Sequence, residues 1–163
     1  FLTARRSEEV TALSAAARGA TILERYLRQD FSSIDVALGK NAVSVQTEPN
    51  FKLTLQLAKP GKNPFLVKSN VIYQFKASGP GYLVERSGKK LQGVLLKEPP
   101  TVANIETSTG FRRLWASFSF TTISPGGQKK RDGELVSYDT SLLVPVPRTI
   151  HTATSVDYTV KVN

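Results

Sequence analysis

A helical pattern runs from the start of this chain to residue 38 and narrows the folds open to it more than anything else in the sequence. Apolar and small side chains recur every three or four positions, which places them on one face of an α-helix. These residues are Val10, Leu13, Ala17, Ala20, Leu23, Leu27, Phe31, Ile34 and Leu38. No proline occurs before Pro49, and Gly39 is suited to end a helix. We predict a helix over about residues 4–38, within an amphipathic segment 1–39.

Such a helix would be roughly 50 Å long at about 1.5 Å per residue, which exceeds the width of a domain of this size. Its second half carries large apolar side chains, which favours packing on a sheet. The residues expected in that contact are Leu23, Leu27, Phe31, Ile34 and Leu38. Its first half carries mostly alanines, so we expect it to project from the domain. The residues left to face a partner are Val10, Leu13, Ala17 and Ala20.

After Gly39 the hydrophobic period changes from 3.6 to 2, which is typical of half-buried strands. The expected strands are 51–57, 71–75, 82–86, 91–96, 115–122, 135–144 and 156–162. Turn residues such as Pro60-Gly61 and Pro125-Gly126-Gly127 separate them. One helix followed by a run of strands predicts an α+β fold with a mainly antiparallel sheet. We expect a single domain over residues 1–163, with 40–163 forming a β-rich head.

The composition restricts the function less than it restricts the fold. The chain has 163 residues, 40% of them hydrophobic, and a net charge of +9, which favours an anionic partner or simply a basic surface. It has no cysteine, which excludes disulfides and thiolate metal sites. No stretch reaches the ~20 consecutive apolar residues of a membrane-spanning helix. The absence of methionine indicates that the chain is processed or cut from a longer product.

Nothing in the sequence predicts catalysis. The single histidine, His151, has no cysteine to pair with, and we expect it to be structural or exposed. No nucleophile elbow or phosphate-binding loop occurs. The acidic residues do not form the dense cluster that calcium requires. We therefore predict a protein that is not an enzyme and has no metal, cofactor or small-molecule substrate.

Two basic clusters leave DNA binding open as an alternative. Arginines beside aromatic residues can follow phosphates while the rings stack on bases. The residues that would contact a polyanion are Arg112, Arg113, Trp115, Lys129, Lys130 and Arg131. The competing interpretation is a solvated loop beside aromatic residues that belong to the core.

Three segments carry a resemblance to a known family. They are Ile22–Asp30 (ILERYLRQD), Val71–Phe75 (VIYQF) with Leu83–Arg86 (LVER), and Leu91–Leu96 (LQGVLL). Their sequence and order, after a long N-terminal helix, resemble the type IV pilin-like proteins over roughly residues 10–120. Within that family, the minor pseudopilins of the J type of type II secretion and related minor pilins are most similar.

The resemblance implies a filament subunit. The residues that would then face neighbouring subunits are Val10, Leu13, Ala17 and Ala20. Such proteins are anchored in the bacterial inner membrane, trimmed by a prepilin peptidase, and carry a head in the periplasm or at the cell surface. Their partners are other minor pseudopilins or minor pilins and the major subunit, with which they begin filament assembly. Phe1 is not the processed terminus in this interpretation, because the family has glutamate at the fifth position and this chain has Arg5. We expect the membrane-spanning half of the helix to lie upstream of Phe1.

Overall fold

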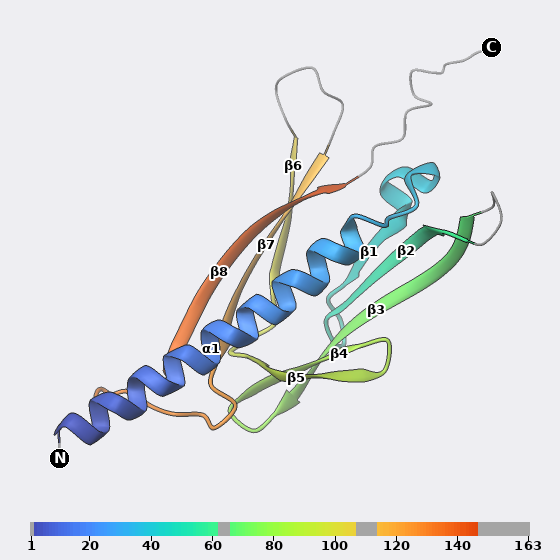
Figure 1. The fold of residues 1–163 in the computed structure, drawn as a ribbon. Helices are drawn as coiled ribbons and strands as arrows, with labels where there is room; N and C mark the ends of the chain where they lie inside the picture. Colours follow the sequence, from blue (N-terminus) through green and yellow to red (C-terminus); the bar gives the residue numbers. More distant parts are fainter. Residues whose placement is uncertain (1, 62–65, 107–113, 147–163) are drawn as a thin grey trace, which may run out of the picture.

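The fold consists of one long helix lying against an antiparallel sheet, which confirms the predicted α+β class (Figure 1). The structure, a computed structural model, describes residues 2–61, 66–106 and 114–146. Helix α1 (Leu2–Phe31) is followed by a short 3-10 helix, η1 (Val36–Ala42). The strands are β1 (Val43–Gln46), β2 (Lys52–Pro60), β3 (Leu66–Ser78), β4 (Gly81–Arg86), β5 (Lys89–Leu96), β6 (Thr101–Glu106), β7 (Leu114–Ile123) and β8 (Ser137–Val146).

The strands form one sheet that curves around α1 like half of a barrel (Figure 1). Strands β1 to β5 are consecutive neighbours, and every pair is antiparallel. Strand β8 pairs with β7 along its whole length. The other edge of β7 is shared, since it pairs with β6 over Leu114–Ser119 and with β5 at Thr122. Helix α1 therefore lies across strands from distant parts of the chain.

The core lies between the concave face of the sheet and one face of α1. Alternate residues of β2 and β3 point inward, as the period-2 pattern predicts. Aromatic rings contribute edge-to-face contacts, with Phe31 and Phe118 at 5.3 Å between centroids. Burying each large apolar side chain contributes about 1.5–3 kcal/mol. The core includes Leu23, Leu27, Leu53, Leu55, Leu57, Val71, Phe75, Phe120, Leu142 and Val144.

Helix α1 ends at Phe31, seven residues before the predicted end. The cause is backbone pairing with β2, because the Ala58 amide donates to the Ser33 carbonyl and the Asp35 amide donates to the Gln56 carbonyl. Asp35 then accepts a hydrogen bond from the Ala37 amide at 3.1 Å and starts η1. The predicted packing contact at Leu38 is therefore wrong, since its side chain is 40% exposed.

The expectation that the alanine-rich first half of α1 projects is wrong for most of its length. Ala12, Ala16 and Ala20 are buried against the sheet. Small side chains let the helix backbone come close to strand backbones, which large residues would prevent. Only the turns before Ala12 extend past the sheet, as the N-terminal end of α1 shows in Figure 1.

Two strands are absent from the sequence-based prediction, and one predicted strand cannot be compared. Strand β1 is short, and β6 follows the Pro99-Pro100 pair that suggested a break. The remaining predicted strands overlap β2, β3, β4, β5, β7 and β8. The predicted strand 156–162 lies outside the described residues, as do Arg112, Arg113 and His151.

Candidate functional site

The last turn of α1 is fixed to the sheet by a buried carboxylate. Asp30 is 1% exposed and accepts two hydrogen bonds from the Arg86 guanidinium, at 2.7 and 2.8 Å. It also accepts a hydrogen bond from the phenol of Tyr73, which is fully buried. The Arg86 guanidinium lies 5.2 Å from the ring centroid of Tyr26, one turn earlier on α1. We call Tyr26, Asp30, Tyr73 and Arg86 the helix anchor.

The electrostatics of the helix anchor depend on the pairing of Asp30 with Arg86. A carboxylate near the C-terminus of a helix is opposed by the helix dipole, so it requires a cation. The hydrogen bond to Asp30 is the main cause that raises the pKa of Arg86. Burial, together with the hydrogen bond to Asp30, raises the pKa of Tyr73 far above its ordinary value. Tyr73 is therefore a neutral donor and Arg86 a permanent cation.

Each segment that carries the family resemblance contributes to the attachment of α1. Asp30 ends the ILERYLRQD segment, Tyr73 lies in VIYQF, and Arg86 ends LVER. The last of these segments, LQGVLL, contributes Gly93, whose carbonyl oxygen would lie 2.7 Å from a Cβ atom at Gly19. Since real Cβ contacts are longer, only glycine at position 19 lets α1 lie this close to β5.

A third attachment lies nearer the start of the helix. The hydroxyl of Thr122, on β7, is buried and donates to the Ala16 carbonyl at 2.7 Å. The attachments at Ala16, Gly19 and Asp30 together span about 21 Å of helix. Helix α1 is therefore held to β3, β4, β5 and β7 along most of its length.

One flank of α1 stays uncovered by the described residues. Val10 is 60% exposed and Leu13 is 45% exposed, and Ala17 is half-buried on the same flank. We call Val10, Leu13 and Ala17 the apolar flank. Two large apolar side chains exposed one turn apart on a helix can pack against a second helix. The predicted subunit contact does not extend to Ala20, because that side chain is 2% exposed within the domain.

The residues predicted to attach the helix to the head mostly lie in the core. Leu23, Leu27, Phe31 and Ile34 are all buried. Ile34 lies beyond α1 and forms an isolated bridge with Leu57 of β2, so it reaches the core from extended backbone. The sequence-based prediction missed the helix anchor, whose members are polar. An Asp on the buried face of a helical pattern, at Asp30, was the signal that could have found it.

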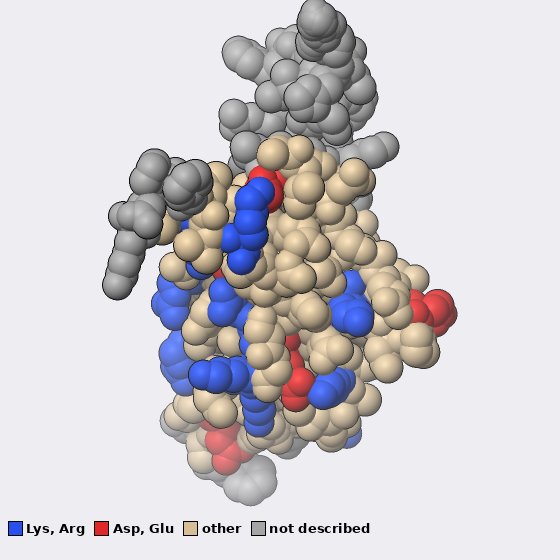
Figure 2. Space-filling model, turned by 90° about the vertical axis from the view of Figure 1, so that its right-hand side faces the viewer, with Lys and Arg blue, Asp and Glu red and all other residues tan. Residues whose placement is uncertain are grey.

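The predicted polyanion contacts are only partly covered by the structure. Lys129, Lys130 and Arg131 are exposed in the turn between β7 and β8, where Asp132 and Glu134 also lie. Figure 2 shows Lys and Arg spread over one face of the molecule, with fewer Asp and Glu among them. Arg112, Arg113 and the Trp115 side chain lie outside the described part of the structure. DNA binding through these clusters stays a prediction.

Other surface features do not extend the candidate site. A hollow of about 420 Å³ on the face of β7 and β8 is lined by residues including Ser119, Thr121, Asp139 and Ser141. The Thr121 hydroxyl donates to Asp139 there at 2.6 Å. In the part of the chain that the structure describes, no three His, Cys, Asp or Glu side chains gather as metal ligands would. Across 2–61, 66–106 and 114–146, no helix has the length and apolar composition for crossing a membrane.

Comparison with known proteins identifies no relative of this chain. No family model matches it, and neither a curated protein nor a solved structure does. The candidate site is therefore defined by its geometry, which is a helix attached at three levels to a curved sheet and exposed along an apolar flank.

Proposed function

We propose that this protein is a structural subunit of a bacterial filament, of the minor pseudopilin or minor pilin kind. The observation that carries the proposal is the arrangement of α1. Its first turns extend past the sheet, and its apolar flank exposes Val10 and Leu13. A helix held rigidly to its head but uncovered on one flank is suited to pack against helices of other subunits.

The helix anchor supports the same proposal. Its residues come from the segments that resemble pilin-like proteins, and they serve to fix the helix relative to the head. In a filament, the head takes its position from the helix that enters the assembly. The buried ion pair at Asp30 and the close contacts at Ala16 and Gly19 hold the helix in a fixed orientation relative to the head.

The proposed role is one of assembly, and it involves packing in place of catalysis. The apolar flank would lie between subunits, while the outer face of the sheet would be displayed in the periplasm or at the cell surface. A membrane-spanning segment upstream of Phe1 would anchor the subunit before assembly. Partners would be other minor subunits and the major subunit of the same filament.

The proposal is tested by placing a charge on the apolar flank. We expect Leu13→Glu in the full-length gene product to reduce incorporation into the filament by at least about tenfold, since a buried carboxylate without a partner opposes packing. The melting temperature of the purified chain should stay unchanged, because Leu13 is 45% exposed. Filament fractions isolated from cells and quantified by immunoblot provide the measurement.

The matched control is Asn50→Glu, which adds the same charge to an exposed residue between β1 and β2, outside α1. This variant should assemble normally. Normal assembly of Leu13→Glu would contradict the proposal, and so would loss of its cooperative melting transition, which would make Leu13 a core residue.

A further inference from the structure

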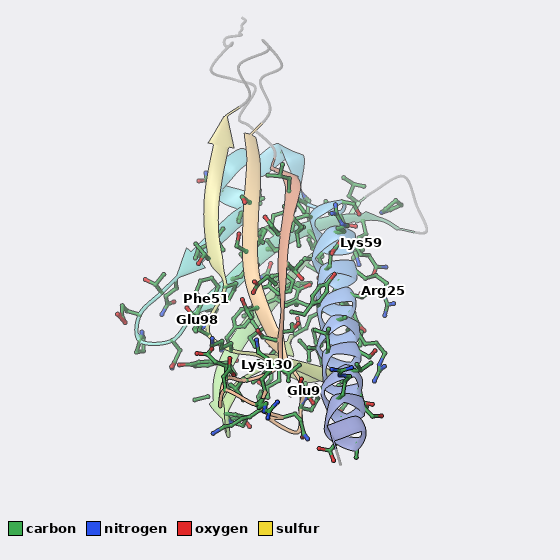
Figure 3. All side chains as sticks on the ribbon, turned by 90° about the vertical axis from the view of Figure 1, so that its left-hand side faces the viewer. Glu9, Arg25, Phe51, Lys59, Glu98 and Lys130 are labelled. Atoms are coloured by element: carbon green, nitrogen blue, oxygen red, sulfur yellow. The ribbon has the colours of Figure 1, made fainter. Side chains whose placement is uncertain are left out.

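The solvent-facing side of α1 carries a row of polar and basic side chains. Ser14, Arg18, Thr21 and Arg25 are all exposed and follow one another at steps of three and four residues, so they share one side of the helix. We call these four residues the basic ridge. Arg18 and Arg25 are separated by seven residues, or about 10 Å along the axis. Figure 3 shows Arg25 pointing away from the strands.

The two arginines of the basic ridge have no salt-bridge partner among residues 2–61, 66–106 and 114–146. The neighbouring Arg28, in contrast, is paired with Glu24 at 2.9 Å. Lys59, which is also exposed, follows the Ala58 amide that bonds to the chain just beyond α1. This side of the molecule therefore presents cations whose charge the described part of the domain leaves uncompensated.

The acidic residues of α1 are not placed to pair with the arginines of a second copy packed against the basic ridge. Glu8 lies on another flank, where Gln128 donates to it at 3.5 Å. Glu9 is half-buried, Glu24 is paired with Arg28, and Asp30 is buried in the helix anchor. If two copies packed ridge to ridge, Arg18 and Arg25 would meet arginines. Each copy would also bring its net charge of +9, so like charges would oppose the contact.

We propose that the basic ridge binds an acidic helix of a different subunit, one that carries Asp or Glu about 10 Å apart. This inference rests on the proposed filament function and names the chemistry of the partner. Ser14 and Thr21 are small, so they allow a second helix to come close. The apolar flank next to them supplies contact area, while Arg18 and Arg25 select the partner and exclude a second copy of the chain.

The test uses as its probe a copy of this chain whose ridge has been made acidic. Arg18→Glu/Arg25→Glu places two carboxylates at the spacing of the arginines on a helix of the same shape. Because the chain has no cysteine, Ser14→Cys adds one crosslinking site to each form, at the N-terminal end of the ridge. We expect a mixture of the two forms to give at least about tenfold more mixed dimer than dimer of either form alone, when crosslinked at low salt. The excess should disappear in about 0.5 M salt, because screening weakens exposed ion pairs.

A charge-matched control separates the ridge from net charge. Lys89→Glu/Lys90→Glu makes the same charge change on exposed residues at the start of β5, outside the basic ridge and the apolar flank. This variant, also carrying Ser14→Cys, should give no excess of mixed dimer with the unmodified ridge. An excess equal to that of the ridge variant would overturn the inference, because overall charge would then explain the association.

Three further outcomes would overturn the inference. If the unmodified chain dimerises through its ridge as strongly as the mixture does, the ridge binds a second copy of the chain instead of an acidic helix. No excess of mixed dimer would remove charge as the basis of partner choice. Binding to phosphatidylglycerol vesicles that is lost in Arg18→Glu/Arg25→Glu, without mixed dimer, would make the ridge a lipid-facing surface. If Leu13→Glu still blocks filament incorporation in any of these cases, the proposed function is retained and only the inference of an acidic partner is rejected.

Discussion

At the scale of single residues, Asp30 is the side chain on which the joint between helix and head depends most. Its carboxylate is 1% exposed and takes three hydrogen bonds from two strands. A buried ion pair contributes little net stability compared with apolar residues, but removing one partner leaves the other charge uncompensated. The helix anchor therefore acts mainly as a positioning device whose disruption is costly.

We expect Asp30→Asn to lower the free energy of unfolding by about 3 kcal/mol, since Arg86 would lose its counterion in a mostly buried position. Urea denaturation of the purified chain measures the loss. The control is Glu24→Gln, which breaks the exposed pair with Arg28 and should cost only about 0.3–0.5 kcal/mol. Equal losses in the two variants would show that burial gives the Asp30 pair no special importance.

A second prediction concerns acid sensitivity at Asp35. The hydrogen bond from Lys68 is the main cause that lowers the pKa of this carboxyl below the ordinary value of 3.8. Because the unfolded chain binds the proton more readily, the pair stabilises the fold above about pH 4 and loses that effect as the pH falls through the folded pKa. Between pH 5 and pH 3, the melting temperature of Asp35→Asn should therefore fall less steeply than that of the unmodified chain.

The partner side of this pair provides the control. Lys68 is 61% exposed at its side chain, so its replacement should not disturb the core. Lys68→Gln removes the cause of the lowered pKa and should also flatten the melting curve against pH in that window. A slope unchanged in both variants would mean that the pair does not form in solution.

At the scale of elements, the contact between α1 and β5 depends on glycine. Alanine is the better helix former by about 1 kcal/mol, yet Gly19→Ala should destabilise the domain by about 1–3 kcal/mol. The new methyl group would meet the Gly93 carbonyl at 2.7 Å, and a backbone oxygen cannot move aside like a flexible side chain. Denaturant unfolding should show the loss, while Ser14→Ala, an exposed change on the same helix, should be neutral or slightly stabilising. A stabilising effect of Gly19→Ala would show that α1 and β5 are farther apart.

The elements also show what sequence reasoning could reach. Leu23 and Leu27 were identifiable because large apolar residues at helical spacing are usually buried together, and the strands followed from strict alternation. The burial of Ala12 and Ala16 could not be predicted, since alanine occurs on exposed helix faces as well as on buried ones. The end of the helix at Phe31 could not be predicted either. It is set by the pairing of Ser33 with β2, a tertiary contact that leaves no pattern in the local sequence.

At the scale of the whole molecule, the candidate site joins parts of the chain that the sequence keeps far apart. Asp30 meets Tyr73 and Arg86, which lie 43 and 56 positions later. Each is an ordinary residue in its own segment, so only the three-dimensional arrangement identifies the helix anchor. The net positive charge could be calculated from the composition, whereas the location of Arg18 and Arg25 on one exposed side of α1 required the structure.

The attachments at Ala16, Gly19 and Asp30 have a mechanical consequence. In the proposed filament, tension would pull on α1 along its axis, and this direction shears every attachment to the sheet at once. Bonds loaded in parallel share the force, and the carbonyl at Gly93 leaves no space in which the helix could slide. Stretching should therefore break contacts between neighbouring subunits before it draws the rod out of its own head.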